Sequence, residues 1–501
     1  MAQYIAAKSI MENHGPTLPS VTASDLSSPM YLPLKNFPEG YSYLIALVWT
    51  VSDNLYFAVI FWQWISILVY ILAFGLIFQV LKAELDSSVI PAFLLIIAFS
   101  LSPWLYYKPT DLMAISFYWL GLALFVSGIE SKPSKAIVFP LVSGILFSLC
   151  MTLRYAYQPI MPVSVTILLL VGIFLKNRKV IVSAIYTLAS TLLGWIIFVL
   201  HFKSPGSLPS EAQSKKIYWE NLLSADWTVF NKPLFDDRIL HSVFFGWGGE
   251  TGVTLSQTLV SLLILVTIIT LLVSYFKSKK LFNSTPKILL ITTGIFTAIA
   301  AVGLLYLLSA LSKPQENDYL HTWTYVRETR YYALLFVIVL LLALIFAFEK
   351  GRTAQWFRIF IWGLIIISIP YYIVAKYRSI RSDPDYFHAG KTKIMFGESK
   401  SPILPELEKH ISESTLNGIP PVYFAANRTI RYAQLIGARV LFPNFSQLST
   451  SNTSHPVALL IHFSNQDPYN KKELQSFIQQ HPPETLFLSP SDTLYRIVVQ
   501  P

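Results

Sequence analysis

The sequence predicts a mainly α-helical protein that crosses a membrane several times and carries a small α/β domain at its C-terminus. Of its 501 residues, 53% are hydrophobic and only 13% are charged, which is far from the balance of a soluble protein. Apolar runs of 18 or more residues recur from Phe57 to about Ala375. Each run can cross a hydrocarbon core of about 30 Å, because a helix rises about 1.5 Å per residue.

Residues 1–55 are expected to form a first exoplasmic loop with short amphipathic helices. The opening MAQYIAAKSIMENHG is polar and mildly amphipathic, and the apolar stretch at 41–51 is too short to cross a bilayer. The chain does not open with a basic segment followed by an apolar one, as a signal peptide does. Either the first span directs the chain to the membrane, or this start is not the natural one.

A transmembrane domain of about ten helices is expected over residues 56–375. The expected spans are 56–81, 89–107, 111–129, 136–153, 156–175, 180–202, 255–276, 287–312, 330–348 and 356–375. Lysine and arginine predict the orientation of these helices. Five connectors are rich in these residues: 82–88, 130–135, 176–179, 277–287 and 349–358.

These connectors hold about 13 basic residues in about 38 positions, whereas the opposite connectors hold a similar number in about three times the length. The positive-inside rule therefore makes the first set cytoplasmic. Both termini and an aromatic-rich loop at 203–254 then face the exoplasmic side. In a bacterium this predicts an inner-membrane protein whose N-terminal loop and C-terminal domain face the periplasm.

The C-terminal segment, 376–501, is expected to form an exoplasmic α/β domain. Its short apolar segments PVYFAA, RVLFP, VALLIHF, ETLFLS and LYRIVV are typical of strands, whereas RTIRYAQLIG and KKELQSFIQQH are typical of helices. Alternation of strands and helices favours a layered α/β structure.

Several function classes lack support in the sequence. No phosphate-binding loop, dinucleotide fingerprint, zinc-protease motif or paired CxxC is present, which argues against ATP-driven transport and zinc proteolysis. The net charge of +10 is spread over short clusters between apolar runs, so we expect no nucleic-acid partner. Cys150 is the only cysteine, which excludes a disulfide within the chain.

The order of the elements carries the strongest functional signal. QYIAAKSIMENHG, a polar loop, NFPEGYSYLIALVW and a long span are followed by SPWLYYKPTDLMAISFYWLGLALF, TLRYAYQPIMPVSVTILLL and ETRYYALLFVIVLLLALIF. This order, together with the tail, resembles bacterial polytopic glycosyltransferases with the type C fold, in the superfamily of the dolichyl-phosphate-mannose protein mannosyltransferases. The resemblance implies transfer of a sugar from a polyprenyl-phosphate donor to an exoplasmic lipid, glycan or protein acceptor.

One part of the family pattern is missing. The family begins with an additional membrane helix and places an acidic residue a few positions before the tyrosine that matches Tyr4. The printed sequence starts after both. Two expectations stay open: a shortened version of an active enzyme, or a family member that has lost activity and binds lipid-linked sugar or envelope-assembly partners. A transporter is a third alternative, with few charged residues inside the spans to support it.

Glycosyl transfer from a phosphate-linked donor needs a carboxylate to take the proton of the acceptor and cations to stabilise the leaving phosphate. Asp111, Arg154 and Arg330 lie at the exoplasmic ends of expected spans, where charge is costly and often functional. We expect Asp111 as the catalytic base and the two arginines as phosphate ligands. The alternatives are a helix-start role for Asp111 and contact with lipid headgroups for both arginines.

Other residues are weaker candidates for substrate binding. They are Tyr4, Lys8, Tyr155, His241 and Tyr331. For Tyr155 and Tyr331, beside the arginines, the alternative is anchoring of the chain at the membrane interface. The resemblance implies that Tyr4, Lys8 and His14 lie near the site if the first loop folds over it, and the alternative is an ordinary amphipathic surface helix.

His241 lies in the densest charged group of the 203–254 loop, with Asp236, Asp237, Arg238 and Glu250. One histidine among scattered acids is weak metal-ligand spacing. We therefore expect no bound cofactor, and the question of a divalent metal stays open.

Overall fold

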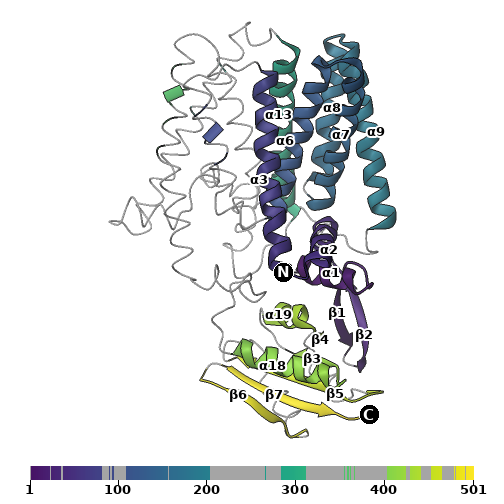
Figure 1. Ribbon diagram of the computed structural model, residues 1–501, viewed down its shortest axis with the longest axis vertical. Helices are drawn as coiled ribbons and strands as arrows, with labels where there is room; N and C mark the ends of the chain where they lie inside the picture. Colours follow the sequence, from purple (N-terminus) through teal and green to yellow (C-terminus); the bar gives the residue numbers. More distant parts are fainter. Residues whose placement is uncertain are drawn as a thin grey trace. The chain divides into compact units, whose positions relative to one another are not determined.

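The computed structural model describes residues 2–22, 24–34, 38–81, 109–155, 157–202, 284–311, 403–424, 429–441, 453–464, 481–490 and 492–501, with a few isolated residues between these ranges. The chain divides into two compact units. One contains long apolar helices, and the other combines the two ends of the chain around a β-sheet (Figure 1).

The helical unit contains most of the described apolar helices. They are α3 (Leu55–Val80), α6 (Pro109–Glu130), α7 (Pro133–Leu153), α8 (Tyr157–Phe174), α9 (Arg178–His201) and α13 (Thr285–Leu311). By length and composition, α3 and α6 to α9 can each cross a membrane. The chain is therefore an integral membrane protein that crosses the bilayer several times.

The expected spans agree with the helices wherever the chain is described. The spans 56–81, 111–129, 136–153, 156–175, 180–202 and 287–312 match α3, α6, α7, α8, α9 and α13. The other expected spans lie outside the described residues, apart from a few isolated helical positions. The short apolar stretch at 41–51 forms α2 (Gly40–Ser52), which is indeed too short to cross.

Helices α6 and α7 form an antiparallel pair that is held together by close backbone approach. The hydroxyl of Ser143 on α7 donates to the carbonyl of Gly121 on α6 at 2.7 Å. About two turns away along the same pair of helices, Cys150 Sγ lies 3.2 Å from the carbonyl oxygen of Ala114. A methyl group at Gly121 would press on the ring of Phe147, so the absence of a side chain there lets the two helices pack closely.

Helices α7 and α9 run in the same direction and pack through small and hydroxyl-bearing residues. Thr187 Oγ1 on α9 donates to the carbonyl of Pro140 on α7 at 3.0 Å. A Cβ atom at Gly144 would collide with the side chain of Ser190 and the carbonyl of Thr187. The contact depends on these small residues, as is common between membrane helices, which have no water to expel.

The second unit contains a seven-stranded sheet in the order β2-β1-β4-β3-β5-β7-β6. Its strands are β1 (Thr17–Thr22), β2 (Asp25–Pro33), β3 (Pro421–Phe424), β4 (Arg439–Leu441), β5 (Val457–Ser464), β6 (Glu484–Leu488) and β7 (Asp492–Val499). Strands β1, β4, β3 and β5 are parallel, and the outer strands are antiparallel to their neighbours. The five strands that the sequence predicts in the tail are all present.

The first strands of the chain join the tail in this sheet. β1 pairs with β4, with Ser20 opposite Val440, and Ser20 Oγ donates to the carbonyl of Val440 at 2.7 Å. Gln434 Nε2 donates to the carbonyl of Pro19 at 2.8 Å. Arg439 Nη1 donates to the carbonyl of Ser27 at 2.7 Å. In each of these bonds a backbone carbonyl accepts from a side chain more than 400 residues away in the sequence, so these acceptors are satisfied.

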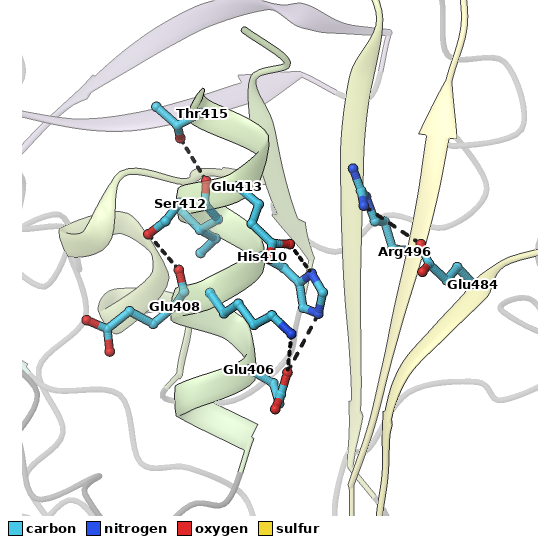
Figure 2. Close-up of polar contacts among 10 residues, drawn as sticks. Glu406, Glu408, His410, Ser412, Glu413, Thr415, Glu484 and Arg496 are labelled. Carbon is cyan, nitrogen blue, oxygen red and sulfur yellow. Dashed lines mark hydrogen bonds and ion pairs between the residues drawn. The ribbon is translucent and has the colours of Figure 1, made fainter. Parts of the chain in front are cut away.

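Two helices, α18 (Ile403–Leu416) and α19 (Thr429–Ile436), pack on one face of the sheet. Apolar residues of α18 recur at helical spacing and contact Tyr423, Leu460 and Leu494. Figure 2 shows polar contacts of α18, where His410 lies 3.1 Å from Glu413 and 3.7 Å from Glu406. Helix α18 and strands β1 and β2 were not predicted from the sequence.

Candidate active site

Two of the charged residues singled out in the sequence meet at one end of the helical unit. Asp111 lies in the first turn of α6, and Arg154 is the residue at which α7 ends. Because α6 and α7 are antiparallel and joined by a short turn, the start of α6 and the end of α7 lie together. Their side chains are 6% and 11% exposed, respectively, so both charges are buried.

The two side chains form an ion pair in which Arg154 Nε lies 2.9 Å from Asp111 Oδ1. A buried charge is costly unless it is paired, and this contact gives each residue a partner of opposite charge. The guanidinium carries five N–H donors in a planar fork. The geometry therefore places a carboxylate and a guanidinium in direct contact in a buried position.

The second carboxylate oxygen of Asp111, Oδ2, is buried and has no hydrogen-bond partner among the described residues. Such an oxygen can accept a proton or a hydrogen bond from a bound hydroxyl group. The alternative role of Asp111, stabilisation of a helix N-terminus, is supported only in part. Asp111 lies where the positive end of the α6 dipole favours an acid, but its carboxylate contacts Arg154 rather than a backbone N–H of the described helix start.

A tight turn fixes the backbone after Arg154. The amide of Tyr157 donates to the carbonyl of Arg154 at 3.1 Å, and the amide of Gln158 donates to that of Tyr155 at 3.0 Å. Gln158 Nε2 also lies 3.4 Å from the carbonyl of Met151. Tyr155, which follows Arg154 in the sequence, is half-buried. The turn restricts the backbone directly after Arg154 and so helps to orient its side chain.

Tyr4 and Lys8 belong to the other compact unit, on α1 (Ala2–Met11). Burial raises the pKa of Tyr4 to about 12, and its ring lies 6.3 Å from that of Tyr41. Lys8 Nζ donates to the carbonyl of Leu435 at 3.0 Å. Burial lowers the pKa of Lys8, although nearby Glu12 opposes the shift. Both side chains thus make contacts inside their own unit.

The remaining candidates gain no structural description. Arg330, Tyr331, His241 and the neighbouring charged residues of the 203–254 loop lie outside the described residues. His14 is described, and its ring stacks on that of Tyr31 at 4.0 Å. In the described parts of the chain no group of three or more His, Cys, Asp or Glu residues could hold a metal ion.

Two buried polar networks were not predicted from the sequence. In the helical unit, Thr297 Oγ1 lies 3.2 Å from the hydroxyl of Tyr118 and 2.9 Å from that of Ser164, which links α13 to α6 and α8. In the sheet, His462 bridges the hydroxyl of Tyr423 and the carboxylate of Asp492, at 2.9 Å each. Single hydroxyl groups and one histidine carry no spacing signal in a sequence, so only the fold shows these networks.

Comparison with known proteins supports the fold. No protein-family model matches the sequence, and no curated protein matches it significantly. Among solved structures, ArnT from Cupriavidus metallidurans bound to undecaprenyl phosphate has a TM-score of 0.52 at 8% identity, covering 99% of this chain and 92% of ArnT. A second match is the archaeal oligosaccharyltransferase AglB from Archaeoglobus fulgidus, in complex with an inhibitory peptide and a dolichol-phosphate. It has a TM-score of 0.38 at 12% identity, and the match covers 89% of this chain and 60% of the AglB chain. The similarity to ArnT supports the type C fold that the sequence resemblance implies, and it concerns the fold alone.

Proposed function

We propose that this protein is a membrane glycosyltransferase that transfers a sugar from a polyprenyl-phosphate donor to an acceptor on the exoplasmic face. The buried pair of Asp111 and Arg154 is the observation that carries the proposal. We assign its carboxylate as the general base and its guanidinium as the phosphate ligand, in contact at one end of a helical bundle. The similarity in fold to ArnT, whose structure contains undecaprenyl phosphate, supports the class of donor.

In the proposed reaction, Asp111 takes the proton from the acceptor hydroxyl through its Oδ2 atom. The acceptor oxygen forms a bond to the anomeric carbon of the sugar, and the bond from that carbon to the phosphate oxygen breaks. The polyprenyl phosphate leaves with the negative charge. Arg154 stabilises this charge through guanidinium N–H donors, in a site where little water screens it.

Two further roles are extensions of this proposal. Arg330 would be a second phosphate ligand, with Tyr155, Tyr331 and His241 beside the substrate. Residues 1–55 and 376–501, which flank the transmembrane domain at 56–375 in the sequence, would both face the exoplasmic side. No cofactor enters the reaction, and a divalent metal, if one is required, would add to the charge that Arg154 supplies.

The test is transfer or hydrolysis of polyprenyl-phosphate-linked sugars by the purified chain in lipid, with Asp111→Asn as the main variant. We expect the loss of one general base to reduce turnover by about 10²- to 10⁴-fold. Asp53→Asn is the matched control, because Asp53 is an exposed acid at the end of α2. Equal turnover by wild type and Asp111→Asn would exclude the assigned role.

Binding of polyprenyl phosphate, measured by native mass spectrometry, separates the enzyme from a binding protein. We expect Arg154→Gln to weaken binding, whereas Asp111→Asn keeps it. Binding without turnover of any sugar donor would support the alternative of a family member that only binds lipid-linked sugar.

A further inference from the structure

Five exposed cations lie on two short connections of the helical unit. Lys132 and Lys135 are on the turn between α6 and α7 and the start of α7, and Lys176, Arg178 and Lys179 are on the connection between α8 and α9. Glu130 is the only acidic residue in the two connections, 130–135 and 176–179. The two connections therefore carry a strong excess of positive charge.

The packing of α7 on α9 brings these connections to the same end of the bundle. Pro140 contacts Thr187, Gly144 contacts Ser190, and Ser148 approaches Gly194. Residue numbers rise together along both helices, so α7 and α9 are parallel. The starts of the two helices, with the cations on them, consequently lie at one level.

An apolar surface begins directly beside the cations. Large aliphatic side chains in the first turns of α7 and α9 are at least 39% exposed. They are Ile137 and Val138 on α7, and Val182 and Ile185 on α9. Lys135 Nζ lies 6.0 Å from the centre of the Phe139 ring. In a helix that spans a membrane, exposed aliphatic side chains face lipid tails, so the cations lie at headgroup level.

We propose that Lys132, Lys135, Lys176, Arg178 and Lys179 form a binding site for the phosphate headgroup of an anionic phospholipid. Its acyl chains would lie on the exposed aliphatic faces of α7 and α9. Basic side chains on one leaflet attract anionic lipids, and here two separate connections converge that contain one acid, Glu130, between the two of them. The site is independent of the proposed transfer reaction, because none of these residues takes part in it.

The test compares retention of phosphatidylglycerol and phosphatidylcholine by the purified full chain, measured by native mass spectrometry in detergent. We expect the wild type to retain phosphatidylglycerol preferentially and to lose the preference at high salt, which screens exposed charges. Equal retention of the two lipids would overturn the proposal without any variant. Displacement of the phospholipid by inorganic phosphate would also overturn it, since the site would then bind a soluble anion.

Variants identify the residues. Replacing Lys132, Lys135, Arg178 and Lys179 with Gln should weaken phosphatidylglycerol retention by roughly fivefold for each cation removed. Replacing the three lysines among them with Arg keeps the charge and should keep the binding. Lys409→Gln removes an exposed cation, 58% exposed, from the other unit and should change nothing. Unchanged retention by the Gln variant would contradict the assignment.

These cations also influence insertion, so the topology of each variant needs a control. A cysteine at exposed Ser134 reports which side of the membrane the turn occupies, through labelling with an impermeant reagent in sealed vesicles. Cys150 is buried and should not react. If the Gln variant inserts in the wrong orientation, the comparison of the two lipids in the wild type still decides the proposal.

Discussion

Arg154 Nε and Asp111 Oδ1 are 2.9 Å apart in the interior of the helical unit, and each charge neutralises the other. The pair is expected to dominate the local stability, because removing one partner leaves an uncompensated charge away from water. We expect Arg154→Met to cost about 3–5 kcal/mol in the free energy of unfolding. Thermal and denaturant unfolding in detergent, followed by circular dichroism, measures this cost.

The double variant Asp111→Asn with Arg154→Met is the control for that prediction. It removes both charges and should recover part of the lost stability, since no unpaired charge remains. If the free-energy costs of the two single changes simply added up in the double variant, the two residues would not be energetically coupled.

The close contact of α7 and α9 predicts that a single methyl group at Gly144 is destabilising. The added Cβ would collide with a backbone carbonyl, which cannot move aside as a flexible side chain can. We expect Gly144→Ala to cost about 1–3 kcal/mol, measured as a loss of thermal stability in detergent. Gly75→Ala on α3 is the matched control, because a Cβ there meets nothing within 4 Å and Ala favours the helix by up to about 1 kcal/mol.

Lys8 connects α1 to the end of α19, and its loss should loosen that junction. Its ammonium donates to the carbonyl of Leu435 at 3.0 Å, one residue before α19 ends. We expect Lys8→Met to cost about 1.5–3 kcal/mol, as for other hydrogen bonds made by charged groups, and to speed amide hydrogen exchange in α19. Lys409→Met is the control. Lys409 is exposed and lies 3.9 Å from Glu406, so its loss should change stability by less than about 0.5 kcal/mol.

Asp25 should make the sheet unit sensitive to acid. Its Oδ1 accepts hydrogen bonds from the amide and hydroxyl of Ser27, at 2.9 and 2.6 Å, and from the amide of Ser28 at 3.3 Å. Hydrogen bonds from the side chains and amides of Ser27 and Ser28, that of the Ser27 hydroxyl first, lower the pKa of Asp25 from 3.8 to about 2. The ionised form is favoured in the folded state, so this stabilisation is complete above the unfolded pKa and is lost as pH falls towards about 2.

The measurement is the unfolding midpoint of wild type and Asp25→Asn between pH of about 5 and about 2. Asparagine can accept the same bonds but does not titrate, so the variant should lose less stability over this range than the wild type. Parallel pH profiles for the two proteins would show that Asp25 does not contribute.

The membrane helices could be predicted from the sequence because each is determined by its own length and composition. The expected span 56–81 and the observed α3, Leu55–Val80, differ by one residue at each end. Tail strands such as VALLIHF were equally clear from their β-branched and aliphatic content. The amphipathic helix α18 was missed although its apolar spacing is regular, because Pro402 and Pro405 suggested a joint. A proline in the first turn is compatible with a helix.

The N-terminal strands could not be predicted locally. The segment TLPSVT contains proline and serine, and becomes a strand by pairing with β4 more than 400 residues later. Candidate site residues were likewise identified by type and position. Asp111 and Arg154 were both selected as charges at the ends of spans, whereas their direct contact depends on how α6 packs on α7, which no local pattern encodes.

The pairing of β1 with β4 has a consequence for synthesis in the cell. The Ser20 hydroxyl and its acceptor on Val440 are separated by 420 residues. At about 5–20 residues per second, β1 waits roughly 20–80 seconds before the ribosome has made its neighbour. During that time Leu18, Val21 and Leu26, all buried in the finished protein, lack the tail that pairs with them. The early hairpin is thus a natural substrate for chaperones and proteases while the spans that follow it are still being inserted.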